Sequence, residues 1–187
     1  MTINNPQTAL LFHGTGGSLD NFWFPWLKTK LESHNFSVTA PQLPEADVVD
    51  IYAWRDFVLQ NYDLENATLI GHSAGANLIL ALLEKLDKPI TKAILVAGFY
   101  QPLTDMPHNH PTLVQNPNWQ KIKQNCAQFY FVHSDNDPWG CNTTQGVFAQ
   151  QHLGGELTVK ENAGHFGSQT FHDPCPTLPV VADLCAG

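Results

Sequence analysis

The sequence Gly71-His72-Ser73-Ala74-Gly75 constrains the fold of this chain more than any other feature. It follows a short apolar run at residues 67–70 and precedes a longer one, residues 76–83, that has the length of a helix. A G-x-S-x-G motif between a strand and a helix is typical of a nucleophile elbow. The glycines let the strand and the helix approach closely. The serine hydroxyl then projects beside a helix N-terminus, whose N–H groups stabilise negative charge.

Short apolar runs alternate with longer, helix-like segments along the whole chain. Most of the short runs are unbroken, which is typical of strands buried on both faces of a parallel sheet. We expect strands at residues 8–13, 36–40, 67–70, 92–98, 128–133 and 156–160. We expect helices at residues 21–33, 50–61, 75–86, 118–124, 143–152 and 177–184. The pattern predicts one α/β domain over residues 1–187, with a doubly wound, mostly parallel six-stranded sheet. Asp50, and either Ser18 or Asp20, are expected helix N-caps.

The charge of the chain argues against several classes of partner. The formal net charge is -8, from 17 acidic and 9 basic residues. Such a chain offers little surface for nucleic-acid phosphates or for anionic membranes, so we expect neither partner. No apolar stretch reaches the length of a membrane span. Residues 1–7 have no basic leader, which predicts a cytoplasmic protein.

The cysteines give no sign of a metal site. They are Cys126, Cys141, Cys175 and Cys185. None forms a C-x-x-C pair, so we expect free thiols and neither a metal nor a cofactor.

Candidate partners for Ser73 follow the last two predicted strands. A serine nucleophile needs a histidine base and an acid that orients the base. In α/β-hydrolases these residues occur in the order serine, acid, histidine. Asp135 and Asp137 follow the fifth predicted strand, and His165 follows the sixth. Loops after parallel strands share one edge of the sheet, so the three groups can meet there. Position alone does not separate Asp135 from Asp137.

The first predicted strand ends in His13-Gly14-Thr15-Gly16-Gly17. This sequence is similar to the glycine-rich motif that supplies one N–H group of an oxyanion hole. We expect the N–H of Thr15 or Gly16, together with that of Ala74, to hold the oxyanion. A nucleotide site is the rival interpretation, but the loop has neither G-x-G-x-x-G nor the G-K-[ST] of a phosphate-binding loop.

Aromatic side chains near these loops are candidates for an apolar acyl site: Trp23, Phe24, Trp139 and Phe166. For Trp23 and Phe24, ordinary core packing is an equal alternative. His72 is expected to point away from the cleft and to pack or hydrogen-bond locally. His13 is expected to shape the adjacent loop. The proline-rich segment 101–117 forms either a short cap over the site or a surface loop. Because little chain length remains for a lid, we expect a small apolar pocket.

The chain resembles the small serine hydrolases typified by retinoblastoma-binding protein 9. The resemblance covers nearly the whole sequence and includes W-x-x-W and W-x-K-I-K-x-N-C segments. The matching segments are residues 10–17, 23–28, 40–44, 70–76, 93–97, 119–126, 134–139 and 164–166. The family pattern S-x-D-D-P-x-x-P maps its catalytic acid onto Asp137. Gly140 and Cys141 depart from the pattern after Pro138.

The resemblance implies a minimal α/β-hydrolase core without the two antiparallel N-terminal strands of larger relatives. It implies a serine hydrolase in which Ser73, Asp137 and His165 form the catalytic triad. We expect a carboxylesterase that acts on small or medium acyl esters. The alternatives are a protein-binding module that retains the fold, for which a protein partner is conceivable, and an amidase or peptidase that uses the same triad.

Overall fold

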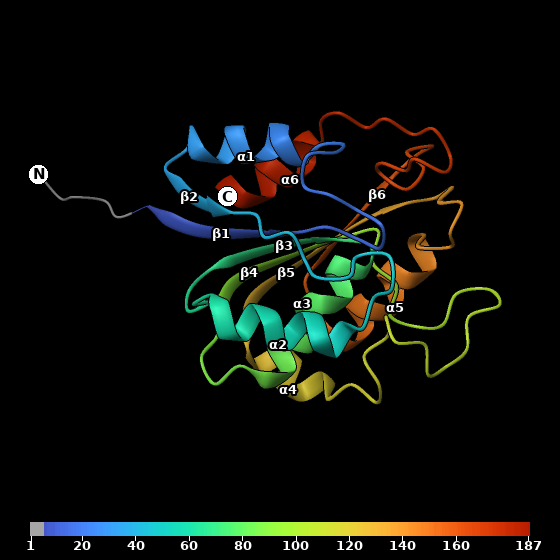
Figure 1. The fold of residues 1–187 in the computed structure, drawn as a ribbon, viewed down its shortest axis with the longest axis horizontal. Coiled ribbons are helices and arrows are strands. Elements are labelled where there is room, and N and C mark those ends of the chain that lie inside the picture. The colour runs from blue at the N-terminus through green and yellow to red at the C-terminus, as the bar shows by residue number, and fades with distance from the viewer. Residues whose placement is uncertain (1–5) are drawn as a thin grey trace, which may run out of the picture.

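The computed structural model describes residues 6–187 (Figure 1). The expected absence of a leader rests mostly on residues 1–5, which lie outside the described residues. The strands are β1 (Gln7–Phe12), β2 (Phe36–Thr39), β3 (Thr68–His72), β4 (Ile90–Val96), β5 (Cys126–Ser134) and β6 (Glu156–Lys160). The helices are α1 (Phe24–Glu32), α2 (Ile51–Asn61), α3 (Ala74–Lys85), α4 (Trp119–Gln124), α5 (Thr143–Leu153) and α6 (Pro179–Ala186).

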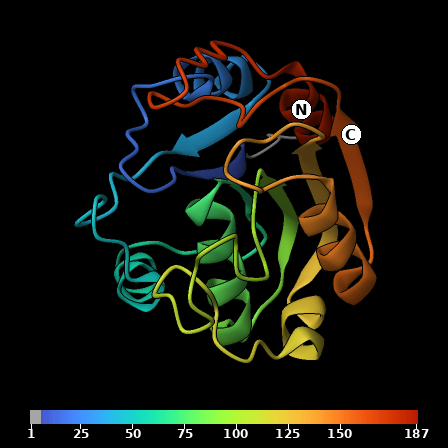
Figure 2. The same ribbon diagram turned by 90° about the vertical axis from the view of Figure 1, so that its right-hand side faces the viewer.

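The six strands form one parallel sheet in the order β2-β1-β3-β4-β5-β6. Helices α1 and α6 cover one face, and α2 to α5 cover the other (Figure 1). The predicted doubly wound α/β fold is therefore confirmed. The strand order reverses between β1 and β3, and such a switch point opens a crevice at the carboxyl ends of the strands. The loops at this edge face the viewer in Figure 2.

The core has two layers, one on each side of the sheet. Every residue of β3 is buried, and so are the last four residues of β1, because these strands lie in the middle of the sheet. Helix α3 is the most deeply enclosed helix, with residues 74–83 all buried. Its N-terminus is therefore fixed directly beneath the crevice.

The predicted N-cap is present at the start of one helix and absent at the start of another. The Asp50 side chain accepts hydrogen bonds from the N–H groups of Tyr52 and Ala53, as predicted for an N-cap. The expected cap at Ser18 or Asp20 is wrong, because α1 begins after Trp23 without a side-chain cap. Pro25 lies in the first turn of α1, where its fixed backbone favours a helix start and no N–H needs a partner.

No helix within residues 6–187 is both long enough and apolar enough to cross a membrane.

Candidate active site

Ser73 is the single residue between β3 and α3, and its backbone is strained. Its φ of 55° and ψ of -120° lie in a region that residues with side chains rarely adopt. A side chain at Gly71 would collide with the carbonyl of Gly75, and one at Gly75 would collide with the carbonyl of Phe12. Both glycines are therefore required for the tight turn that presents Ser73.

The glycine loop after β1 packs directly against this turn. A Cβ atom at Gly14 would lie 2.8 Å from the Cβ atom of Ser73, so only glycine fits there without a shift. The N–H of Gly16 donates to the carbonyl of Ala46 at 2.8 Å, and it is therefore not free for an oxyanion. Between the two predicted donors, this favours Thr15, whose N–H has no partner within residues 6–187. Ala74 begins α3, so no carbonyl of the helix pairs with its N–H.

The buried side chain of His13 fixes the glycine loop through hydrogen bonds. Its Nδ1 donates to the carbonyl of Gly14 at 2.8 Å, and its Nε2 accepts from the N–H of Leu43 at 3.0 Å. The Gln42 amide also donates to Nε2, at 3.1 Å. Burial lowers the pKa of His13, which agrees with a neutral ring that donates on one side and accepts on the other. His13 therefore fixes the loop, as the sequence predicts, and does not act as a free base.

The structure brings Asp137 and His165 together. The Nδ1 of His165 donates to Asp137 Oδ2 at 2.7 Å, and both side chains are almost fully buried. Asp137 Oδ1 accepts from the N–H of Trp139 at 2.8 Å, which fixes the plane of the carboxylate. Because the proton lies on Nδ1, the Nε2 atom of His165 is available as an acceptor.

Asp135 has a different partner from Asp137. Its Oδ1 accepts from the N–H of Asn162 at 2.8 Å, in the loop after β6. The Asn136 side chain accepts from the N–H of Gly164 at 2.9 Å. The Ser134 hydroxyl accepts from the N–H of Ala163 at 3.0 Å. Three consecutive side chains, the last of β5 and the two that follow it, therefore hold the loop that carries His165.

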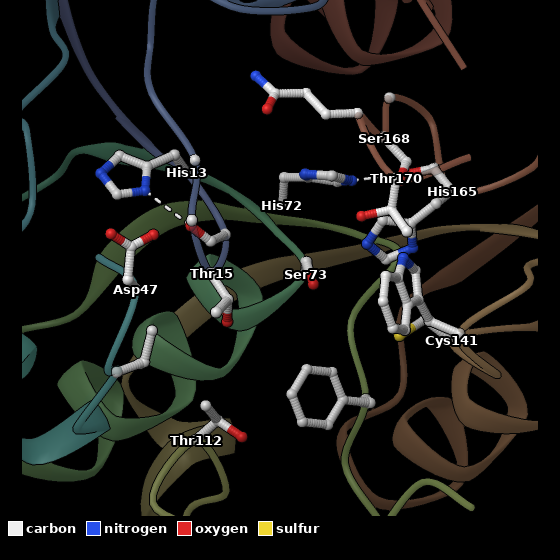
Figure 3. A pocket seen from close by; sticks show the side chains of 18 of the residues that line it. His13, Thr15, Asp47, His72, Ser73, Thr112, Cys141, His165, Ser168 and Thr170 are labelled. Carbon is white, nitrogen blue, oxygen red and sulfur yellow. Dashed lines mark hydrogen bonds between the residues drawn. The ribbon is translucent and has the colours of Figure 1, made fainter. Parts of the chain in front are cut away.

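A cavity of about 700 Å³ lies at the carboxyl ends of β1, β3 and β4, and both Ser73 and His165 line it (Figure 3). No hydrogen bond joins the Ser73 hydroxyl to His165 among the described residues. Such contacts are often loose without substrate and tighten when substrate binds. Separate loops form its walls and bring both apolar and polar side chains to it, and the small apolar pocket stays a prediction.

The four aromatic side chains predicted for the acyl site divide into two pairs. Phe24 and Trp139 line the cavity, and Trp139 is 46% exposed at its mouth. Trp23 and Phe166 do not line it, because both are buried in the core. For Trp23 the alternative of core packing is confirmed, and for Phe166 the prediction is wrong.

The segment 101–117 forms one wall of the cavity through Leu103, Met106 and Thr112. It is anchored to the domain, because the carbonyl of Thr112 accepts from the buried Asn77 amide at 2.8 Å. Pro111 is also anchored, since its carbonyl accepts from the N–H of Ile51 at 2.9 Å. Of the two expectations for this segment, its place on the cavity favours the cap.

Three donor groups near the site could in principle hold a metal ion. A donor atom of each of Asp137, Cys141 and His165 lies within 4.8 Å of the others. Burial, together with the Asp137 charge, raises the pKa of the Cys141 thiol well above its usual value. A metal needs the thiolate, and Asp137 and His165 are already bonded to each other. The donor set therefore fits an acid–histidine pair better than a metal centre. The sequence marked Cys141 only as a departure from a pattern.

Together, the parallel sheet, the strained serine turn and the buried acid–histidine pair define a protein of the α/β-hydrolase class. Comparison with known families assigns the chain more closely. The sequence model described as "Serine hydrolase" matches residues 9–183. The chain belongs to this serine hydrolase family.

Individual relatives agree over almost the entire chain. The serine hydrolase RBBP9 of Rattus norvegicus is 27% identical over 174 residues, which cover 90% of this chain and 92% of that protein. The protein described as "Putative hydrolase YdeN" from Bacillus subtilis (strain 168) is 28% identical over 182 residues, which cover 95% of this chain and 94% of that protein. The crystal structure of the B. subtilis ydeN product has a TM-score of 0.86 at 24% identity and covers 96% of both chains. The resemblance that the sequence indicated is confirmed.

Proposed function

We propose that this protein is a carboxylesterase that hydrolyses small or medium acyl esters through an acyl-enzyme on Ser73. The observation that carries the proposal is the buried 2.7 Å pair of His165 and Asp137 on the cavity that Ser73 lines. A base with a fixed tautomer beside a strained serine turn is the arrangement that nucleophilic acyl transfer requires.

The reaction follows from these positions. The Ser73 oxygen attacks the carbonyl carbon of the ester, and its proton passes to Nε2 of His165. The N–H groups of Thr15 and Ala74 stabilise the oxyanion that forms. Asp137 stabilises the imidazolium, which then gives its proton to the departing alkoxide. Water, deprotonated by His165, attacks the acyl-enzyme and releases the carboxylic acid and free Ser73.

The cavity supports the choice of substrate. Its volume of about 700 Å³ lies within the range of pockets that enclose small molecules. Phe99, Leu103 and Met106 give one wall apolar surface for an acyl chain. Polar groups on the side of the glycine loop can hydrogen-bond the more hydrophilic part of an ester.

A fluorophosphonate probe tests the nucleophile. We expect one label per chain, on Ser73, and none in Ser73→Ala, with the fold of the variant checked by circular dichroism. His165→Ala should lower kcat at least about 10³-fold, since the members of a triad act as a unit. Labelling that persists in folded Ser73→Ala contradicts the assignment.

A substrate panel tests the reaction class. We expect p-nitrophenyl esters with short and medium acyl chains to react faster than matched thioesters and anilides. Anilides need a protonated leaving group, which is a harder step. If the protein is labelled but prefers anilides, Ser73 remains the nucleophile and the proposed reaction class changes from esterase to amidase.

A further inference from the structure

The loop that carries His165 turns through four residues with positive φ, and one of them is strained. Asn162, Gly164, Phe166 and Gly167 all have positive φ, at 54°, 58°, 55° and 116°. Phe166 immediately follows His165 and has a bulky side chain, for which this conformation costs about 1–2 kcal/mol. Strain of this kind persists only where the surroundings impose it.

Two buried side chains hold this loop in addition to the Ser134–Asn136 contacts. The Nε2 of His72 donates to the carbonyl of His165 at 2.7 Å. The Nε1 of Trp23 donates to the carbonyl of Phe166 at 2.9 Å. His72 is 4% exposed and Trp23 is fully buried, so neither bond competes with water. Two consecutive carbonyls of the strained loop are therefore each held by a dedicated side-chain donor.

The two donors also support each other. The rings of Trp23 and His72 meet edge to face, with centroids 6.0 Å apart. Phe24 stacks on Trp23 at 4.2 Å and meets the His72 ring at 6.3 Å. This packing fixes both rings, so that their N–H groups can point in only one direction.

We propose that His72 and Trp23 are positioning residues. By donating hydrogen bonds to the carbonyls of His165 and Phe166, they hold the His165 ring in its position relative to Ser73 and Asp137. The inference rests on the proposed function. His72 is the last residue of β3 and lies directly before Ser73 in the nucleophile elbow. Trp23 lies directly before α1. A direct bond therefore joins the nucleophile turn to the base loop. His72 also lines the cavity, contrary to the expectation that it points away from the cleft.

The charge state of His72 agrees with this role. Its ring centroid is 4.7 Å from that of His165. Burial, assisted by the nearby His165, lowers the pKa of His72 to about 3. A neutral His72 donates to the loop without opposing the positive charge that His165 acquires during the reaction.

Matched substitutions separate the two hydrogen bonds from the packing of the rings. Trp23→Phe keeps an aromatic ring and removes the donor. His72→Leu removes the donor, and His72→Gln keeps an N–H group of similar reach. Trp26→Phe is the control, because Trp26 belongs to α1 and makes no side-chain hydrogen bond within residues 6–187.

We expect Trp23→Phe and His72→Leu each to lower kcat about 10- to 100-fold with KM within about 2-fold. A displacement of about 1 Å in a catalytic group has effects of this size. His72→Gln should recover most of the activity, and Trp26→Phe should keep it. In proton NMR, the low-field signal of the His165 Nδ1–H should broaden in the two impaired variants, because the loop no longer holds the Asp137 bond steady.

The outcome is decided on folded variants, checked by thermal melting. If Trp23→Phe fails to fold, the comparison of His72→Leu with His72→Gln still tests the proposal. A kcat within 2-fold of wild type in the donor-free variants overturns the proposal, and so does an effect confined to KM or an equal loss in Trp26→Phe. A wild-type protein that neither labels with fluorophosphonate nor hydrolyses esters contradicts the proposed function instead.

Discussion

Asp135 and Asp137 lie two residues apart and face different partners. Asp137 bonds to the His165 ring, whereas Asp135 bonds to the backbone N–H of Asn162. Only Asp137 can therefore fix the tautomer of His165. Asp135 contributes to the shape of the loop that follows β6.

We predict that Asp137→Asn retains the fold and lowers kcat by up to about 10⁴-fold. The asparagine amide can hold the wrong tautomer of His165 and provides no charge for the imidazolium. Asp135→Asn is the matched control and should cost much less, because its amide oxygen still accepts from Asn162. Steady-state kinetics and thermal melts on both variants decide the matter. An inactive Asp135→Asn beside an active Asp137→Asn would exchange the two roles.

At the residue scale, the sequence indicated candidates that only tertiary contacts could separate. Ser73 has a local motif, so sequence alone could place it. Asp135 and Asp137 both follow β5, and the family resemblance, not their position, favoured Asp137. Thr15 and Gly16 are equivalent until the carbonyl of Ala46, which is distant in sequence, takes the Gly16 N–H.

At the scale of elements, unbroken apolar runs predicted the central strands because strands inside a parallel sheet are buried on both faces. The edge strands β2 and β6 are only partly buried, and their sequences mix polar with apolar residues. The ends of the strands were less certain. Strand β3 continues through Gly71 and His72, where the sequence no longer resembles a strand. The start of α1 was misplaced because serine and aspartate also form local turns. The Ser18 hydroxyl accepts from the N–H of Asp20 and caps no helix.

The N-cap of α2 gives a prediction about an element outside the site. Asp50→Ala removes the acceptor for the N–H groups of Tyr52 and Ala53, and it should lower the free energy of unfolding by about 1 kcal/mol. Asp56→Ala, on the same helix, breaks only an exposed contact with Arg55 and should cost less. Urea unfolding measures both changes. Equal effects would contradict the capping argument.

At the scale of the whole molecule, buried neutral histidines link stability to pH. The pKa of His72 is lowered to about 3, and burial also lowers the pKa values of His13 and His133. Below about pH 6.5, an unfolded chain binds protons at these positions that the folded chain excludes. Their contribution to stability is therefore complete above that pH and decreases as the pH falls, and for His72 the decrease continues toward pH 3.

We predict that the free energy of unfolding decreases as the pH is lowered from 6.5 to 4. Each histidine that stays neutral in the fold contributes up to about 1.4 kcal/mol per pH unit. His72→Gln cannot titrate, so its stability should depend less steeply on pH than that of the wild type. Urea unfolding at several pH values measures the slopes. Parallel slopes for the two proteins would show that His72 is not the linked group.

The charge distribution of the whole molecule bears on which esters reach the site. The net charge is -8, and of the aspartate, glutamate, lysine and arginine residues, only Asp47 is among those that line the cavity. Asp47 lies beside the glycine loop in Figure 3 and has no ion-pair partner within residues 6–187. The potential at the cavity should therefore repel anionic substrates.

We predict that the p-nitrophenyl monoester of glutarate, which is anionic, reacts with a kcat/KM at least about 3-fold below that of neutral p-nitrophenyl valerate. The gap should narrow in 0.5 M salt, because the screening length falls from about 10 Å at 0.1 M toward about 3 Å at 1 M. Asp47→Asn should also narrow it. Asp87→Asn changes the net charge equally, but Asp87 follows α3, whose opposite end lies at Ser73, so it should have little effect. An anionic ester that reacts as fast as its neutral counterpart at low salt would show that the field of the molecule does not select substrates.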